Sequence, residues 1–96
     1  MTVKILIRRK VSADKAVKLK DLVMQLRALS VKQPGYVTGE SLKSVANPDQ
    51  YLVISTWDSK NAWNAWLGTK ERATIQDQID TLLGSKTEYE VYEYRP

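Results

Sequence analysis

Apolar and polar side chains alternate along four stretches of the chain, and this period-two pattern predicts four β-strands. In residues 2–11, Val3, Ile5 and Ile7 should point to one side of a strand and their neighbours to the other. Residues 36–45 and 51–57 form the next two predicted strands, and residues 87–94, in which glutamates and tyrosines interleave, form the last. Pro48 presets a turn in the short link at residues 46–50, so the middle strands should form an antiparallel hairpin.

Helical periodicity marks the segments between these strands. The first predicted helix follows an N-cap at Ser12 and ends before Pro34 and Gly35. Its apolar face consists of Leu19, Leu22, Val23, Leu26 and Leu29. A second helix should begin at Asp58 or Ser59 and continue to residue 67. Residues 68 and 69 then restart a helix with an apolar face formed by Ile75, Ile79, Leu82 and Leu83, and Gly84 closes it.

The resulting order, β-α-β-β-α-β, predicts an α+β protein of the ferredoxin-like type. We expect a four-stranded antiparallel sheet with the helices on one face and the first and third strands in the centre. The 96 residues form a single domain, residues 1–96. A chain this small cannot easily leave the second sheet face bare, so we predict a homodimer in which two copies pair through that face.

Composition removes several classes of chemistry. The sequence has no cysteine and no histidine. Thiolate nucleophiles, Fe–S clusters, histidine general bases and imidazole-ligated metals are therefore excluded, and we expect no cofactor and no metal site. No apolar run has the length of a membrane span and no secretion signal is evident, so we expect a cytoplasmic protein that does not bind membranes.

The net charge of +4 could indicate a nucleic-acid partner. The basic residues are scattered, however, as in Arg8–Lys10, Lys18 and Arg72, and no recognition-helix motif accompanies them. We therefore interpret the charge as a solvated surface and predict no binding to nucleic acid.

Several segments together resemble the antibiotic biosynthesis monooxygenase superfamily. These are the run Gln-Pro-Gly-Tyr-Val at residues 33–37, the turn Asn-Pro-Asp at residues 47–49 and the strand-to-helix stretch at residues 51–59. An aromatic residue nine positions after Trp57 is a further similarity, and the resemblance covers nearly the whole chain. It implies a dimeric α+β barrel with a pocket between the sheet and the helices of each subunit. Activities in this superfamily include cofactor-free oxygenation of phenolic or quinol-like molecules and degradation of haem.

The spacing of Trp57 and Trp66 is most similar to the haem-degrading branch of that superfamily. Trp66 matches the pocket tryptophan of the branch. Its pocket histidine corresponds to Gln76, however, and its pocket asparagine on the first strand corresponds to Arg9. Iron would have no evident protein ligand, so haem degradation is only a third alternative.

Each candidate site residue has a purely structural interpretation as well as a functional one. Trp57 and Trp63 fit the core, although Trp63 is also a candidate for substrate binding, and Trp66 is the expected pocket wall on which a planar ligand would stack. Arg72 and Gln76 lie four residues apart on one helical face, where they are either boundary residues or donors to a ligand oxygen. Tyrosines on the last strand are more typical of dimer packing than of catalysis.

Arg9 continues the alternation of Val3, Ile5 and Ile7, so its side chain should point toward the helices. It could reach solvent along its stem, or it could stabilise negative charge on a phenolate or an oxygenated intermediate. The leading prediction is a cofactor-independent monooxygenase acting on a small aromatic molecule, with Arg9 and Gln76 catalytic and Trp66, Arg72 and Trp63 binding substrate. A non-catalytic small-molecule-binding dimer is the alternative.

Overall fold

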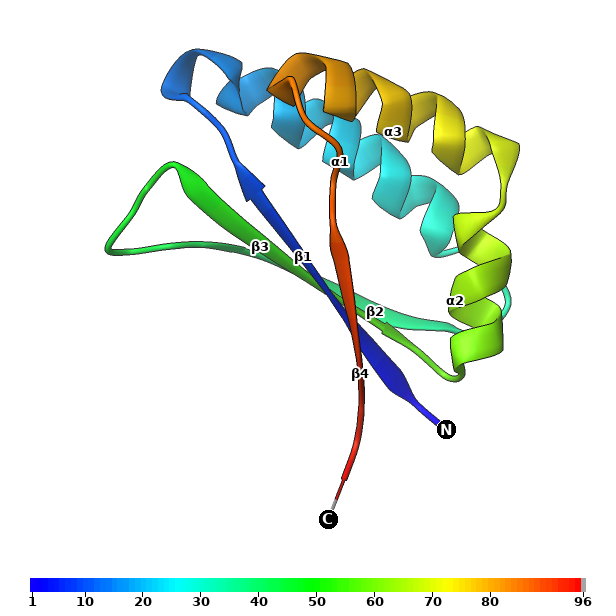
Figure 1. The fold of residues 1–96 in the computed structure, drawn as a ribbon. Helices are drawn as coiled ribbons and strands as arrows, with labels where there is room; N and C mark the ends of the chain where they lie inside the picture. The colour runs from blue at the N-terminus through cyan, green and yellow to red at the C-terminus, as the bar shows by residue number, and fades with distance from the viewer. Residues whose placement is uncertain (96) are drawn as a thin grey trace.

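The computed structural model describes residues 1–95 and contains one four-stranded antiparallel sheet, as predicted. The strands are β1 (Val3–Lys10), β2 (Tyr36–Lys43), β3 (Gln50–Trp57) and β4 (Tyr89–Glu93), and their spatial order is β2-β3-β1-β4. The first and third strands therefore occupy the centre. The fold is ferredoxin-like, with the helices on one face of the sheet (Figure 1).

Three helices follow from the apolar faces in the sequence. α1 (Ala16–Ser30) and α3 (Lys70–Leu83) pack side by side across the sheet, and the short α2 (Lys60–Leu67) covers the end where β3 finishes (Figure 1). Ser59 caps α2 by accepting a hydrogen bond from the Ala62 N–H at 3.1 Å. Gly84 closes α3 in the left-handed conformation, with φ 72°.

Several predicted boundaries were wrong by a few residues. Ser12 makes no side-chain capping bond, and residues Ala13–Lys15 form the 3-10 turn η1 before α1 begins. α1 ends at Ser30, and the predicted stop at residues 34 and 35 is instead the turn into β2, where Gly35 has φ 85°. β4 begins at Tyr89 rather than residue 87 because the backbone N–H of Thr87 donates to Asp80 on α3 and not to a neighbouring strand.

Strand parity separates a buried sheet face from a bare one. On β1, Val3, Ile5 and Ile7 are buried against the helices, and Arg9, the next residue of the same parity, is also buried. The buried side chains form two adjoining clusters, one around Trp57 under α2 and one between α1 and α3. Near the first cluster, a Cβ on Gly35 would lie 2.5 Å from the Ala62 Cβ, so only glycine lets this turn pack against α2.

Within residues 1–95, no helix covers the opposite face of the sheet (Figure 1). Its centre pairs Leu6 with Ile54 and Leu42 with Leu52 across the strands. At its edge, Arg8 forms an ion pair with Glu90. The uncovered second face predicted from the sequence is thus present, whereas its pairing with a second copy stays a prediction.

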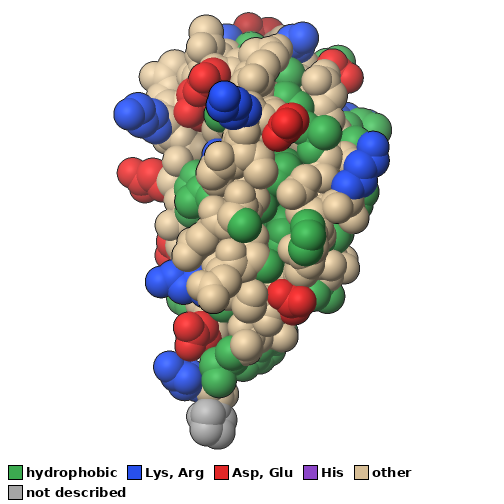
Figure 2. All heavy atoms as spheres, turned by 90° about the vertical axis from the view of Figure 1, so that its right-hand side faces the viewer, with side chains coloured by type: hydrophobic (Ala, Val, Ile, Leu, Met, Phe, Trp, Pro, Cys, Tyr) green, Lys and Arg blue, Asp and Glu red, His purple; other side chains and the backbone are tan. Residues whose placement is uncertain are grey.

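The surface shows two further features. Seen from the side of α2, positive and negative side chains are interspersed among apolar and neutral ones rather than gathered by sign (Figure 2). Within residues 1–95, none of the helices combines the length and the apolar character needed to cross a membrane.

Candidate functional site

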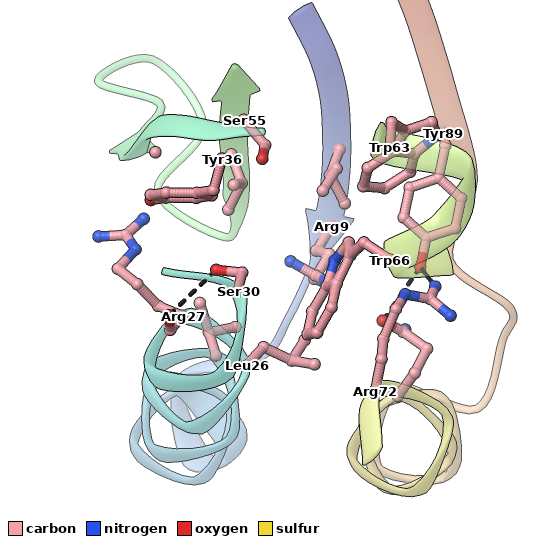
Figure 3. A pocket seen from close by; sticks show the side chains of 15 residues that line it. Arg9, Leu26, Arg27, Ser30, Tyr36, Ser55, Trp63, Trp66, Arg72 and Tyr89 are labelled. Atoms are coloured by element: carbon pink, nitrogen blue, oxygen red, sulfur yellow. Dashed lines mark hydrogen bonds between the residues drawn. The ribbon is translucent and has the colours of Figure 1, made fainter. Parts of the chain in front are cut away.

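A cavity of about 60 Å³ lies between the sheet and the helices (Figure 3). Its wall brings together all five side chains predicted from the sequence: Arg9, Trp63, Trp66, Arg72 and Gln76. These residues come from three separate elements, β1, α2 and α3. The alternation on β1 and the residue spacings on α2 and α3 thus place all five side chains in one cavity. The contacts of each side chain show that the five have different roles.

The tryptophans form the aromatic wall. Trp57 is fully buried and makes an edge-on contact with Trp63, with ring centroids 6.0 Å apart, so it is a core residue as predicted. Trp66 stacks on Trp57 with an interplanar angle of 23° and also lines the cavity. Because α2 places residues three apart on one face, Trp63 and Trp66 are its two buried side chains.

The α3–β4 side of the cavity is a continuous hydrogen-bond network. The Gln76 amide nitrogen donates to Asp80 and to Thr87, each at 2.8 Å. The Gln76 carbonyl oxygen accepts from the Tyr89 hydroxyl at 3.1 Å. Both N–H donors of Gln76 are therefore used within the protein. The sequence predicted that Gln76 would orient a ligand, whereas these bonds suit it to holding Asp80, Thr87 and Tyr89 in place.

Arg72 is a buried cation that belongs to the same network. Its Nη2 donates to the Tyr89 hydroxyl and its Nη1 donates to the Leu67 carbonyl at 3.2 Å. The guanidinium also lies against the Tyr89 ring, 5.3 Å from its centroid. These contacts fix the orientation of Arg72 beside the cavity (Figure 3).

Tyr89 is a site residue that the sequence interpretation missed. That interpretation assigned the tyrosines of the last strand to dimer packing, but β4 pairs Tyr89 with Ile7 and so turns it toward the helices. Burial raises the pKa of Tyr89, and the nearby Arg72 and Arg9 oppose that rise. The signal that could have identified Tyr89 is its register with β1, which depends on pairing between segments distant in sequence.

Arg9 differs from every other polar residue of the wall. It projects from β1 between the side chains of α1 and those of α3 and β4 (Figure 3), and it is 7% exposed. Its Nε is buried without a hydrogen-bond partner. Among residues 1–95, the ion pairs join Arg8 to Glu90, Lys10 to Asp49 and Arg95 to Glu93, and none includes Arg9.

Burial lowers the pKa of Arg9, Tyr89 and Asp80 oppose this shift, and the nearby Arg72 adds to it. A guanidinium nevertheless stays protonated in proteins, so Arg9 is a buried cation that forms no ion pair within the described residues, and Asp80 acts on it only at longer range. No Asp or Glu is among the residues that line the cavity. The arrangement can therefore attract an anion, or favour ionisation of a phenol, but it offers no carboxylate as a general base.

The α1 side of the cavity was also missed from the sequence. Arg27 Nη2 donates to the Ser41 hydroxyl on β2 at 3.0 Å, and both Arg27 and Tyr36 line the cavity. Gly39 faces them, and a Cβ there would lie 3.0 Å from the Tyr36 hydroxyl. This side is therefore shaped by a small residue on β2, which periodicity alone does not reveal.

Comparison with solved structures supports the same fold. A conserved protein from Methanosarcina mazei superposes with a TM-score of 0.90 at 15% identity, covering 99% of this chain and 94% of that one. A mutant of SnoaB, a cofactor-independent oxygenase from Streptomyces nogalater, superposes with a TM-score of 0.87 at 20% identity, again covering 99% of this chain and 94% of that one. At these identities the likeness concerns the fold alone.

Comparison with curated protein sequences found no match. The family model for antibiotic biosynthesis monooxygenase, by contrast, matches residues 2–78, from β1 through most of α3. This span includes Arg9, Trp63, Trp66, Arg72 and Gln76 and stops before Tyr89. The chain belongs to the antibiotic biosynthesis monooxygenase family.

Proposed function

We propose that this protein is a cofactor-independent monooxygenase that acts on a small planar phenolic or quinol-like molecule. The observation that carries the proposal is the buried, unpaired Arg9 beside the Trp66 wall. A flat indole suits an aromatic ring, and a cation in a site shielded from water favours the ionised form of a phenol. Family membership and the fold shared with SnoaB support oxygenation as the reaction class.

In such a reaction the substrate itself supplies the electrons. The phenol loses its hydroxyl hydrogen and one ring hydrogen, and O₂ adds at that ring carbon. One oxygen atom forms a new C=O bond there, and the other leaves as water with the two hydrogens, so the product is a quinone. Arg9 would stabilise the negative charge that passes from the substrate to oxygen. Arg72, held by Tyr89 and by the Leu67 carbonyl, would supply a second fixed positive charge. Gln76 would act by positioning Tyr89.

Oxygen uptake tests this proposal directly. The protein is incubated with a panel of quinols and flavonoid-like phenols, and oxygen consumption is followed alongside that of the Arg9→Met and Trp66→Ala variants. We expect consumption with at least one compound and a loss of roughly a hundredfold in the Arg9→Met variant. Consumption no greater than that of Trp66→Ala across the panel would count against an oxygenase.

A non-catalytic binding protein is the second candidate, and the absence of a carboxylate in the cavity wall favours it. In a thermal-shift screen, compounds that raise the unfolding temperature and are recovered unchanged in air would indicate binding alone. Haem degradation gains no support, because Gln76, which stands where that branch has its histidine, is held by hydrogen bonds within the protein.

The bare sheet face supports a homodimer. The paired leucines and Ile54 at its centre would bury their apolar area against the same face of a second copy. Light scattering at micromolar concentration should give twice the 11.0 kDa of one chain. A monomeric mass would contradict this part of the proposal.

A further inference from the structure

A second, larger hollow lies between α1 and the β2–β3 hairpin. Its volume is about 570 Å³. The side chains from α1 include Val17 and Met24, which are 81% and 61% exposed. Tyr51 and Val53 of β3 line the opposite side. The hollow, which we call the α1 groove, is therefore a mainly apolar channel at the edge of the sheet.

The α1 groove adjoins the cavity that Trp66 lines. Four residues line both spaces: Arg9, Val23, Arg27 and Val53. Arg9 and Val53 come from the adjacent central strands, and Val23 and Arg27 lie one turn apart on α1. A ligand bound at Arg9 would consequently lie where the two spaces meet, next to the α1 groove.

The volumes of the cavity and the α1 groove indicate which part of a ligand each could hold. Pockets for drug-sized ligands measure roughly 300–1,000 Å³. The cavity, at about 60 Å³, is far below that range, whereas the α1 groove, at about 570 Å³, lies within it. The cavity can admit one end of an organic molecule, and the remainder needs the groove.

All charged residues that line the α1 groove and the cavity are basic. The basic residues lining the groove are Arg9, Lys20, Arg27 and Lys43. No acidic residue lines either the groove or the cavity. Of these cations, Arg9 is buried with an unpartnered Nε, so the site is complementary to an anion at the junction of the two spaces.

We infer that the ligand is an elongated, amphiphilic organic anion. Its ionised aromatic end lies at Arg9 and Trp66, and its apolar extension lies in the α1 groove against Val23, Met24 and Tyr51. This inference deepens the proposed function by naming the substrate class, and it rests on the same cavity. A compact phenol without an extension would use only part of the binding surface.

Two homologous acids and a neutral analogue test the inference without requiring oxygenation. The test ligands are 4-methoxybenzoate, 4-octyloxybenzoate and 4-octyloxybenzyl alcohol, titrated into the protein with tryptophan fluorescence as the signal. We expect the octyl ether acid to bind at least roughly tenfold more tightly than the methyl ether acid, because its octyl chain buries apolar surface in the α1 groove. The alcohol should bind roughly tenfold more weakly than the octyl ether acid.

Matched variants locate each part of the ligand. Met24→Glu places a charge in the groove, and Gln25→Glu places the same charge at the next, exposed position of α1, outside both spaces. We expect Met24→Glu to abolish the advantage of the octyl chain and Gln25→Glu to preserve it. Arg9→Met should weaken both acids roughly tenfold and leave the alcohol unchanged.

Three results would overturn the inference: equal affinities for the two acids, equal effects of the two glutamate variants, or an altered molar mass of Met24→Glu in light scattering. The last result would assign the groove to a second copy of the chain. Because these ethers are not quinols, their binding is separate from catalysis. Tight binding without oxygen uptake by the phenol panel would reject the oxygenase and keep the ligand class.

Discussion

The two buried guanidiniums that line the cavity differ in their hydrogen-bonding surroundings. Arg72, on the α3–β4 side, is 8% exposed and donates to both Tyr89 and the Leu67 carbonyl. Arg9, on the β1 floor, is 7% exposed and has an Nε with no partner. The burial of the two side chains is nearly the same, whereas their hydrogen bonding differs.

This difference indicates that Arg72 has a structural role and that Arg9 is available to bind a ligand. A buried polar group whose donors are hydrogen-bonded contributes to folding, whereas a buried charge with an unpartnered donor costs free energy in the absence of a ligand. The α3–β4 side therefore resembles a preorganised support, and Arg9 is the group left free for a ligand. Substitutions on the two sides should differ in the sign of their effect on stability.

Gln76→Leu should have the largest effect, because Gln76 joins Asp80, Thr87 and Tyr89. The variant leaves the Tyr89 hydroxyl without its acceptor and weakens the hydrogen bonding of Asp80. We expect the free energy of unfolding to fall by about 3 kcal/mol in urea denaturation. Gln78→Leu, an exposed position on the same helix, is the control and should change it by less than about 0.5 kcal/mol. Similar losses in both variants would mean that the network does not stabilise the fold.

Arg72→Met should follow, with a loss of about 2 kcal/mol. Methionine keeps the length of the buried stem but removes the donors to Tyr89 and to the Leu67 carbonyl at the end of α2. Thermal unfolding monitored by circular dichroism measures the change. A variant as stable as the parent would show that the Arg72 contacts only compensate for its burial, and the contrast with Arg9 would then be lost.

Tyr89→Phe should cost about 1 kcal/mol at neutral pH and should also alter the pH dependence of stability. Burial raises the pKa of Tyr89 in the folded state above its ordinary value near 10. The folded protein then holds this proton more tightly than the unfolded chain, so the contribution is present below pH 10 and is lost as pH rises through the folded-state pKa.

Urea denaturation at a series of alkaline pH values reveals this contribution as a difference between proteins. Above about pH 10 the parent should lose stability more steeply than Tyr89→Phe. Tyr94→Phe serves as control, because Tyr94 is 58% exposed, and should follow the parent. Parallel curves for the parent and Tyr89→Phe would contradict the role of burial.

The sequence predicted the β1 floor and the α2 wall of the cavity better than its α3–β4 side. Alternation on β1 was enough to place Arg9 among inward-facing side chains, and the spacing on α2 was enough to place Trp63 and Trp66 together. Both are local patterns, set by the periods of a strand and a helix. The fold followed in the same way, from the order of the local elements.

Tyr89 could not be placed in this manner, because its direction depends on the register of β4 against β1. A shift of one residue would have turned it to the bare face. The role of Gln76 depended in turn on Tyr89 and on Thr87, which binds Asp80 instead of extending the strand. Contacts between distant segments therefore decided the site roles that periodicity left open.

Arg9→Met should have the smallest effect on stability, and its sign is the sharpest test of the comparison. The substitution removes an unpartnered buried charge and keeps most of the stem packing, so the free energy of unfolding should stay the same or rise by up to about 1 kcal/mol. The same variant should lose the stabilisation that an added anionic ligand gives the parent protein. Urea denaturation with and without 4-octyloxybenzoate measures both quantities. A loss of about 2 kcal/mol without ligand would show that Arg9 is held by the fold as Arg72 is, and the two sides of the cavity would then be alike.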